Sequence, residues 1–125
     1  METSLHIIVG LAGLPLLFLG LRSLFKPRTM ADAFSVVPKG AAGLSTLRSL
    51  PGGLFLASVA MLILGLTTGD TTWLLSVALI MGAVAMGRIV GIVSDGLVKE
   101  VVPPLLVELV IGGALVTAHF VLGAP

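Results

Sequence analysis

Long apolar runs separated by short polar stretches dominate the sequence, and they cover residues 5–24, 50–67, 72–94 and 103–122. Each run is close to the about 20 apolar residues that a helix needs to cross a bilayer. The stretches between them contain Gly or Pro together with polar residues, which is typical of turns. The pattern therefore predicts an all-α fold, a transmembrane four-helix bundle that forms a single domain over residues 1–125.

Composition supports a membrane protein over a water-soluble one. Apolar residues make up 57% of the chain and charged residues 10%, with a mean hydropathy of +1.19, whereas soluble domains usually carry about 25% charged residues. The net charge of +1 gives no basic field that would favour nucleic acid. The chain has no cysteine, which excludes disulfides and thiolate metal sites.

Basic residues cluster at two of the connections and predict the topology. Lys99 lies between the third and fourth runs, and five more basic residues lie at or between the ends of the first and second runs: Arg22, Lys26, Arg28, Lys39 and Arg48. The two termini and the TTGDTT connection carry no Lys or Arg. The positive-inside rule therefore places both basic loops in the cytoplasm and the N- and C-termini on the outer side.

The first basic loop contains a second, shorter helical pattern. In MADAFSVV, apolar residues recur at i, i+3, i+4 and i+7, at Met30, Ala33, Phe34 and Val37. Basic residues flank this segment on both sides. We expect a short amphipathic helix in this cytoplasmic loop, lying on the lipid headgroups.

Charged residues within or beside the apolar runs are the candidate functional residues. Arg88 and Asp95 are seven residues apart, about two turns along one helix face. Glu108 lies at a similar depth, because the third and fourth runs are joined by a short loop and run antiparallel. We therefore expect Arg88 to pair with Glu108, and Arg48, which opens the second run, to pair with Asp95.

Two interpretations of these charges stay open. In one, Arg48, Arg88, Asp95 and Glu108 form ion pairs that fix the register of the helices. In the other they line a polar ligand-binding pocket, since ionisable groups inside a membrane commonly mark functional sites. A guanidinium in such a pocket would donate hydrogen bonds to a carboxylate, phosphate or carbonyl oxygen.

Other residues give no comparable signal. The glycines, among them Gly87 and Gly91 in a G-x-x-x-G spacing, are expected at helix contacts. His6 and His119 lie near the outer surface, where two histidines without a third ligand do not predict a metal site. We find no nucleophile–base arrangement, phosphate-binding loop or HExxH motif, and so predict no catalytic residues.

The order of several motifs is similar to that of a known family. LFKP ahead of an AF pair, then LRSLPGGLFLA, GRIVGIVSDG and a lone Glu in the last run occur over nearly the whole chain. In this the sequence resembles a family of small bacterial four-helix membrane proteins that is described only as a domain of unknown function. It resembles more loosely the DoxX-like four-helix proteins, some of which belong to quinone-linked redox systems. The resemblance implies a multi-pass protein of the bacterial cytoplasmic (inner) membrane.

Three functions are consistent with the sequence. We expect a non-enzymatic protein that binds an amphipathic ligand, a lipid or a quinone, near the four charged residues, or that serves as an accessory subunit of a larger membrane complex. The second is a membrane enzyme or quinone-linked redox subunit in which Glu108 or Asp95 transfers protons. The third is a small transporter or channel that works as a homo-oligomer.

Overall fold

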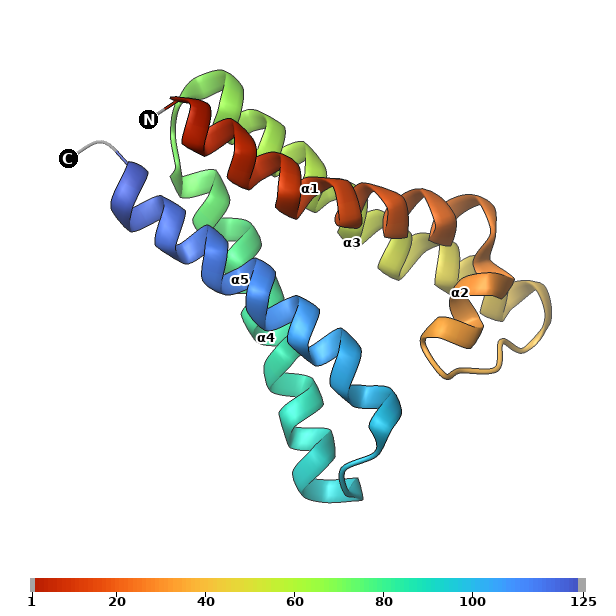
Figure 1. Ribbon diagram of the computed structural model, residues 1–125. Helices are drawn as coiled ribbons and strands as arrows, with labels where there is room; N and C mark the ends of the chain where they lie inside the picture. Colours follow the sequence, from red (N-terminus) through yellow and green to blue (C-terminus); the bar gives the residue numbers. More distant parts are fainter. Residues whose placement is uncertain (1, 124–125) are drawn as a thin grey trace. The chain divides into compact units, whose positions relative to one another are not determined.

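The computed structural model describes residues 2–123, which are almost entirely helical and contain no strand. The all-α prediction is therefore confirmed for this range. In chain order (Figure 1) the elements are α1 (Glu2–Phe25), α2 (Pro27–Ala33), α3 (Gly40–Thr68), α4 (Thr72–Asp95), the 3-10 helix η1 (Lys99–Val101) and α5 (Val102–Leu122).

Four segments of the described chain are long and apolar enough to cross a membrane. They are Thr3–Phe25, Gly40–Thr68, Thr72–Asp95 and Lys99–Leu122. Large apolar side chains on them face outward, including Leu11 at 71% exposure, Val93 at 82% and Phe120 at 73%. Apolar side chains directed away from the protein are expected when lipid replaces water as the solvent. The chain is thus a multi-pass membrane protein.

The second span begins ten residues earlier than the apolar pattern predicts. α3 starts at Gly40, whose φ of +58 suits glycine, and it continues through Pro51. The prediction that Arg48 opens this helix is therefore wrong, because Arg48 lies in its third turn. Counting apolar residues locates the hydrocarbon-spanning part of a helix, whereas the hydrogen-bonded helix extends beyond it.

The short helix predicted in the first loop exists but is displaced. α2 spans Pro27–Ala33, with Pro27 at its first turn, where the missing N–H is not needed. Met30 is buried within the protein and does not face lipid, whereas Phe34 caps the helix and Val37 lies beyond it, 91% exposed. Fixing φ at Pro27 starts the helix three residues before the apolar pattern does.

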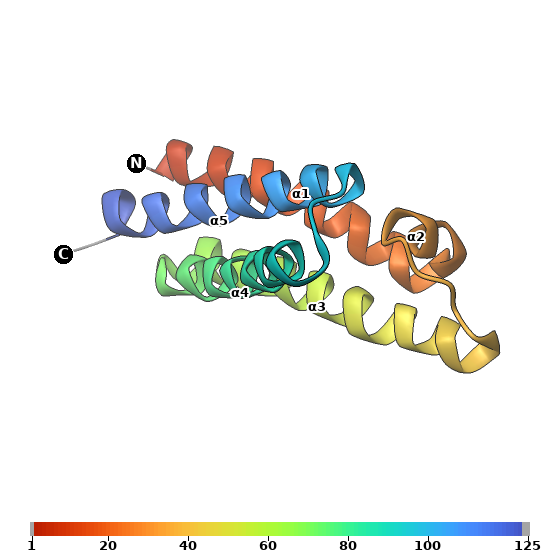
Figure 2. The same ribbon diagram turned by 90° about the horizontal axis from the view of Figure 1, so that it is seen from below.

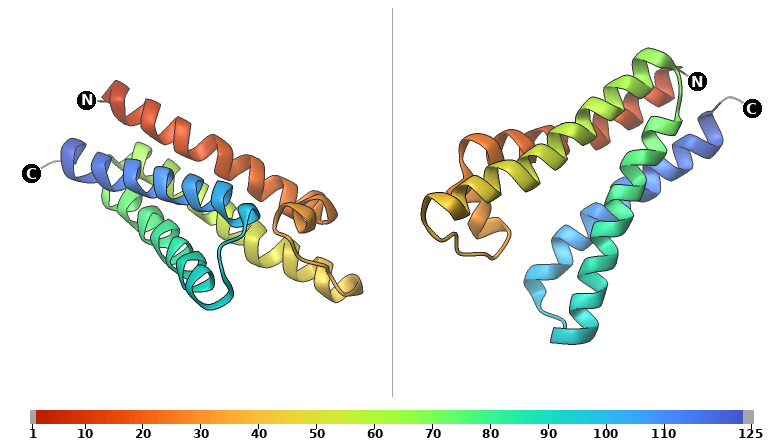
Figure 3. Two further views of the ribbon diagram at one scale, coloured as in Figure 1. Left: turned by 60° about the horizontal axis from the view of Figure 1, so that its bottom comes forward. Right: turned by 180° about the vertical axis from the view of Figure 1, so that it is seen from behind.

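The described chain packs as two compact units, residues 2–12 with 61–123 and residues 13–60. We call them unit 1 and unit 2; the prediction of a single domain stays a prediction. Unit 1 contains parts of all four long helices, and within it α4 and α5 run side by side over their length (Figure 3). Its buried core includes Leu62, Leu74, Met81 and Leu115.

Small residues set the close helix contacts of unit 1. At Gly112 on α5, a Cβ would lie 3.3 Å from the Met81 Cβ of α4. At Gly65 on α3, it would lie 2.6 Å from a methyl group of Leu74. Glycine permits these backbones to approach, which is how helices pack where no hydrophobic effect drives them together.

Unit 2 is built on the second half of α1, α2 and most of α3. Gly52 of α3 lies against α1, where its Cβ would be 3.6 Å from the Ser23 Cβ and 3.7 Å from the Gly20 carbonyl oxygen. α2 lies beside the Phe25 end of α1 and the first half of α3 (Figure 2). The ring of Phe34, which follows α2, stacks on the ring of Phe55 with 6.5 Å between the ring centroids. The C-terminal end of α2 is thereby held against α3.

Candidate functional site

An ion pair joins the two helices that form the long hairpin of unit 1. Arg88 of α4 donates from Nε to both carboxylate oxygens of Glu108 on α5, with the Nε–Oε2 distance at 2.9 Å. The Glu108 side chain is only 9% exposed and that of Arg88 is 30% exposed. The pairing predicted from the sequence is confirmed.

Glu108 is buried because of its position on α5. It shares one helix face with the buried residues Ile111, Gly112, Leu115 and Ala118. This face packs against α4, so the carboxylate enters the protein interior instead of lipid. A charge there needs a partner, since an unpaired carboxylate in hydrocarbon costs several kcal/mol.

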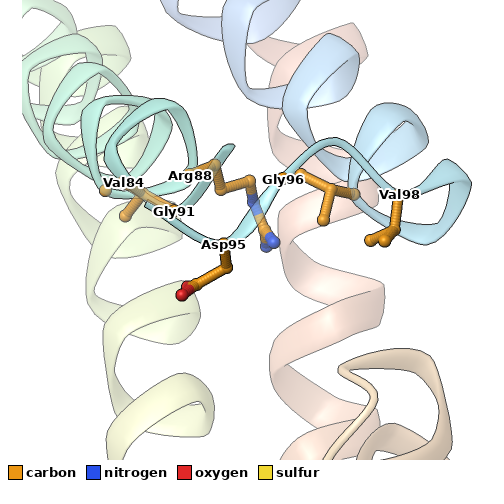
Figure 4. Close-up of a pocket in the computed structure, with 8 residues that line it drawn as sticks. Val84, Arg88, Gly91, Asp95, Gly96 and Val98 are labelled. Carbon is orange, nitrogen blue, oxygen red and sulfur yellow. The ribbon is translucent and has the colours of Figure 1, made fainter. Parts of the chain in front are cut away.

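A cavity of about 420 Å³ lies next to the pair, at the end of α4 (Figure 4). Its lining comes from the last three turns of α4, the connection after it and η1, and consists of Val84, Gly87, Arg88, Gly91, Asp95, Gly96, Val98 and Val101. The sequence predicted Arg88 and Asp95 on one helix face, and both line this cavity, together with Gly91 between them. Val98 and Val101 had no sequence signal, because the fold of the connection brings them there.

Arg88 presents part of its guanidinium to this cavity. Among residues 2–123, its two terminal amino groups make no hydrogen bond, since the bonds to Glu108 use Nε alone. In Figure 4 the guanidinium reaches toward the connection that carries Gly96 and Val98, whereas the Asp95 carboxylate points away from it. The cavity therefore offers hydrogen-bond donors next to apolar walls.

Two glycines give the cavity its depth. A Cβ at Gly87 or Gly91 would have no other atom within 4 Å. The expectation that this G-x-x-x-G pair lies at a helix contact is therefore wrong for the described chain. The missing side chains instead leave space beside Arg88.

The connection after α4 is shaped by Gly96, which adopts φ +94 at the end of the helix. Its N–H donates to the Ile92 carbonyl at 3.0 Å, closing the last turn. A residue with a Cβ rarely adopts this φ, so glycine permits the chain to leave α4 and return toward η1. This return places Val98 and Val101 on the cavity wall.

Of the other two predicted site residues, Asp95 lines the same cavity as Arg88, and Arg48 belongs to unit 2. Asp95 is exposed at the end of α4. Arg48 lies in unit 2, where it is exposed and donates from Nη1 to the Leu24 carbonyl oxygen. Its predicted pairing with Asp95 stays a prediction.

Polar groups also meet at the opposite end of the hairpin. Thr71, which is buried, and His119 of α5 hydrogen-bond through Oγ1 and Nδ1 at 3.0 Å. Beside them, Asp70 accepts a hydrogen bond from the Thr72 N–H at 3.0 Å, and hydrogen bonds from Thr72 lower the pKa of Asp70, with a smaller effect of nearby His119. His119 is thus hydrogen-bonded. Residues 2–123 contain no group of three or more His, Asp or Glu side chains that is arranged to hold a metal ion.

Comparisons with known proteins give a family and no activity. No curated protein and no solved structure shows detectable similarity to the chain. One family matches residues 4–119, a range that includes all the long helices almost in full and the Arg88–Glu108 pair. The chain belongs to this family, which is described as "Domain of unknown function (DUF4345)".

Proposed function

We propose that this membrane protein is a non-enzymatic binding protein for an amphipathic molecule, a lipid or a quinone. The polar end of the ligand occupies the cavity beside Arg88, and its apolar tail leaves along α4 into the bilayer. The terminal amino groups of Arg88 donate to a carboxylate, phosphate or carbonyl oxygen of the ligand. A protein loaded in this way also suits the role of an accessory subunit in a larger membrane complex.

The proposal rests on one observation: the nitrogen atoms of the Arg88 guanidinium have two different environments. Its Nε is held by Glu108, while its terminal amino groups stay without a hydrogen bond among residues 2–123 and border a cavity. A purely structural ion pair has no need of a cavity walled by two glycines. Glu108 orients the guanidinium and offsets the cost of placing it within the membrane.

The size of the cavity limits what it holds. At about 420 Å³ it lies within the roughly 300–1,000 Å³ range of small-molecule sites. This space suits a headgroup or a quinone ring, and the tail stays outside. The apolar lining residues Val84, Val98 and Val101 can contact the start of such a tail.

The contact between Arg88 and Glu108 argues against proton transfer by Glu108. Both oxygens of this carboxylate are bound by Arg88, and its side chain is 91% buried, which leaves little room for a substrate beside it. Asp95 is exposed but points away from Arg88 in Figure 4. We therefore favour binding over catalysis.

We propose further that the cavity opens on the cytoplasmic side of a bacterial inner membrane. Lys99 lies in the connection beside it, and the N-terminus, the Asp70 connection and the C-terminus carry no basic residue. The positive-inside rule supports this orientation. Labelling of single cysteines introduced at Ser4 and at Lys99, in intact cells with a membrane-impermeant maleimide, tests it; labelling at 99 alone contradicts it.

Ligand binding is tested with a variant whose new side chain fills the cavity and leaves every charged residue in place. Gly91→Leu places a side chain where a Cβ meets no other atom, so the helix accepts it while the cavity is blocked. We expect the gently purified parent protein to carry a bound lipid or quinone in native mass spectrometry. Its occupancy should fall by at least about tenfold in Gly91→Leu.

Gly82→Leu is the matched control. Gly82 is on the same helix and also has no atom within 4 Å of its Cβ position, but it does not line the cavity. This variant should keep the bound molecule. A parent protein that carries no bound molecule, or equal occupancy in both variants, contradicts the proposal.

A further inference from the structure

A separate cavity in unit 2 has a strongly basic wall. It measures about 330 Å³ and lies where α1 passes into α2, next to the start of α3. Its lining is Phe25, Lys26, Pro27, Arg28, Thr29, Leu44 and Arg48. Three of these seven residues are cations and none is an anion.

These cations have no acidic partner among residues 2–123. The ion pair between Arg88 and Glu108, in unit 1, is the one formed in that range, and Lys26 and Arg28 make no side-chain hydrogen bond there. Unit 2 contains a single carboxylate, Asp32, which does not line the cavity. Like charges around one cavity repel each other, so binding of an anion would relieve an unfavourable interaction.

The wall of the cavity is held in place by the backbone around it. Arg48 is tied to α1 by its bond to the Leu24 carbonyl. Arg22 donates from Nε to Thr29 Oγ1 at 2.9 Å, and Thr29 Oγ1 donates to the Lys26 carbonyl at 2.7 Å. Together with buried Pro27, these bonds fix the turn from which Lys26 and Arg28 extend.

A second cavity adjoins the basic one and is largely apolar. It measures about 430 Å³ and shares Phe25, Lys26 and Thr29 with its neighbour. Its remaining lining is Phe18, Leu21 and Arg22, and the Arg22 guanidinium lies over the Phe18 ring at 5.6 Å. Phe18, Leu21 and Phe25 share one exposed face of α1, which suits an acyl chain.

We propose that these adjoining cavities form a binding site for an anionic phospholipid. The phosphate of the lipid lies among Lys26, Arg28 and Arg48, and an acyl chain lies along Phe18, Leu21 and Phe25. Basic pockets between membrane helices recognise phosphate headgroups in this way. The site is in unit 2 and uses none of the residues around Arg88, so it stands independently of the function proposed above.

Native mass spectrometry with added phosphatidylglycerol tests the site, with phosphatidylcholine as the zwitterionic comparison. Lys26→Gln removes one cation of the wall and should lower the apparent affinity for phosphatidylglycerol about fivefold. Arg28→Gln should have a similar effect. Both side chains are exposed and make no internal bond, so both variants should keep the helical circular dichroism of the parent.

Lys39→Gln is the matched control, because Lys39 is in the same basic loop but outside the cavity. Its effect should be less than about twofold. Equal losses in Lys26→Gln and Lys39→Gln would show diffuse attraction to the surface and overturn the proposal. Gly91→Leu should leave phosphatidylglycerol binding unchanged, which separates this site from the Arg88 cavity.

Inorganic phosphate and glycerol phosphate separate a lipid from a free anion. Both carry the phosphate but no acyl chain, so they should displace phosphatidylglycerol only weakly. Displacement by either at the concentration at which the lipid binds would mean that the acyl chain contributes nothing. That result overturns the assignment to a lipid.

Discussion

Arg88 on α4 is bound through Nε to both carboxylate oxygens of Glu108 on α5, twenty residues further along the chain. The pair connects the two helices of the hairpin in unit 1 and leaves the outer part of the guanidinium at a cavity. It therefore serves two purposes at once: it neutralises a buried carboxylate, and it orients a hydrogen-bond donor.

Charge reversal tests the structural purpose. Arg88→Glu places two carboxylates together in the membrane, and breaking a buried pair in this way costs about 3–5 kcal/mol. We expect a strongly reduced yield of folded protein in detergent, measured by size-exclusion chromatography. Adding Glu108→Arg should recover part of that yield, and an unchanged yield in the double variant would argue against a direct pair.

The negative charge of Asp95 should weaken the binding of an anionic ligand. Asp95 lines the cavity and is exposed, so its carboxylate opposes binding of an anion without supporting the fold. Asp95→Asn should strengthen binding of an anionic ligand by about two- to fivefold, as expected for one partly screened charge. Titration by native mass spectrometry measures this change, and weaker binding would place Asp95 among the residues that hold the ligand.

Two neighbouring glycines on α5 should respond in opposite directions. Gly112 faces α4, with its Cβ position 3.3 Å from the Met81 Cβ, whereas the Cβ position of Gly113 has no other atom within 4 Å. Gly112→Leu should overpack the helix contact and lower stability by about 1–3 kcal/mol. Gly113→Leu should instead gain about 0.5–1 kcal/mol from helix propensity. Thermal unfolding in detergent compares the two, and equal shifts would contradict the observed packing.

We expect the folded protein to lose stability in acid as Asp70 becomes protonated. Hydrogen bonds from Thr72, and to a smaller extent the nearby His119, lower the pKa of Asp70 below its ordinary value. The carboxylate therefore stabilises the fold above about pH 4, and this contribution is lost as pH falls through the lowered pKa. Asp70→Asn can still accept from Thr72 but does not titrate, so its melting temperature should fall less between pH 6 and pH 3. A parallel fall in both proteins would contradict this role.

The sequence located the long helices well and the short elements less well. The third span was predicted at 72–94 and is Thr72–Asp95, because its ends coincide with changes from apolar to polar residues. The start of α3 was missed by ten residues, since residues 40–49 are helical without being strongly apolar. The number of consecutive apolar residues indicates which part of a helix is stable in lipid. The length of the helix itself depends on backbone hydrogen bonds, which polar residues also form.

The candidate site was predictable only in part. Arg88 and Glu108 could be paired from the sequence, because a short connection between antiparallel helices brings residues at equal depth together. The cavity could not, because a glycine looks the same in sequence whether it faces a helix or empty space. A Cβ at Gly112 would lie against Met81, whereas a Cβ at Gly91 would have no other atom within 4 Å.

The basic residues of the first loop were used in the sequence only to infer orientation. Their convergence on one cavity depends on where α2 begins and on the bond from Arg48 to the Leu24 carbonyl. Neither feature has a periodic pattern. A count of cations gives their number near a membrane surface, but their spacing depends on how the loop folds.

By itself, the sequence determined that this chain is a four-span helical membrane protein with an arginine and a glutamate facing each other, because both follow from one-dimensional quantities. These are the length of apolar runs against the thickness of a bilayer, and the distance of a charge from a turn. The tertiary structure alone decided which glycines pack and which leave space, and which cations share a cavity. Those properties depend on the rotation of each helix about its axis and on the path of each connection, which are set by side-chain packing across helices far apart in the sequence.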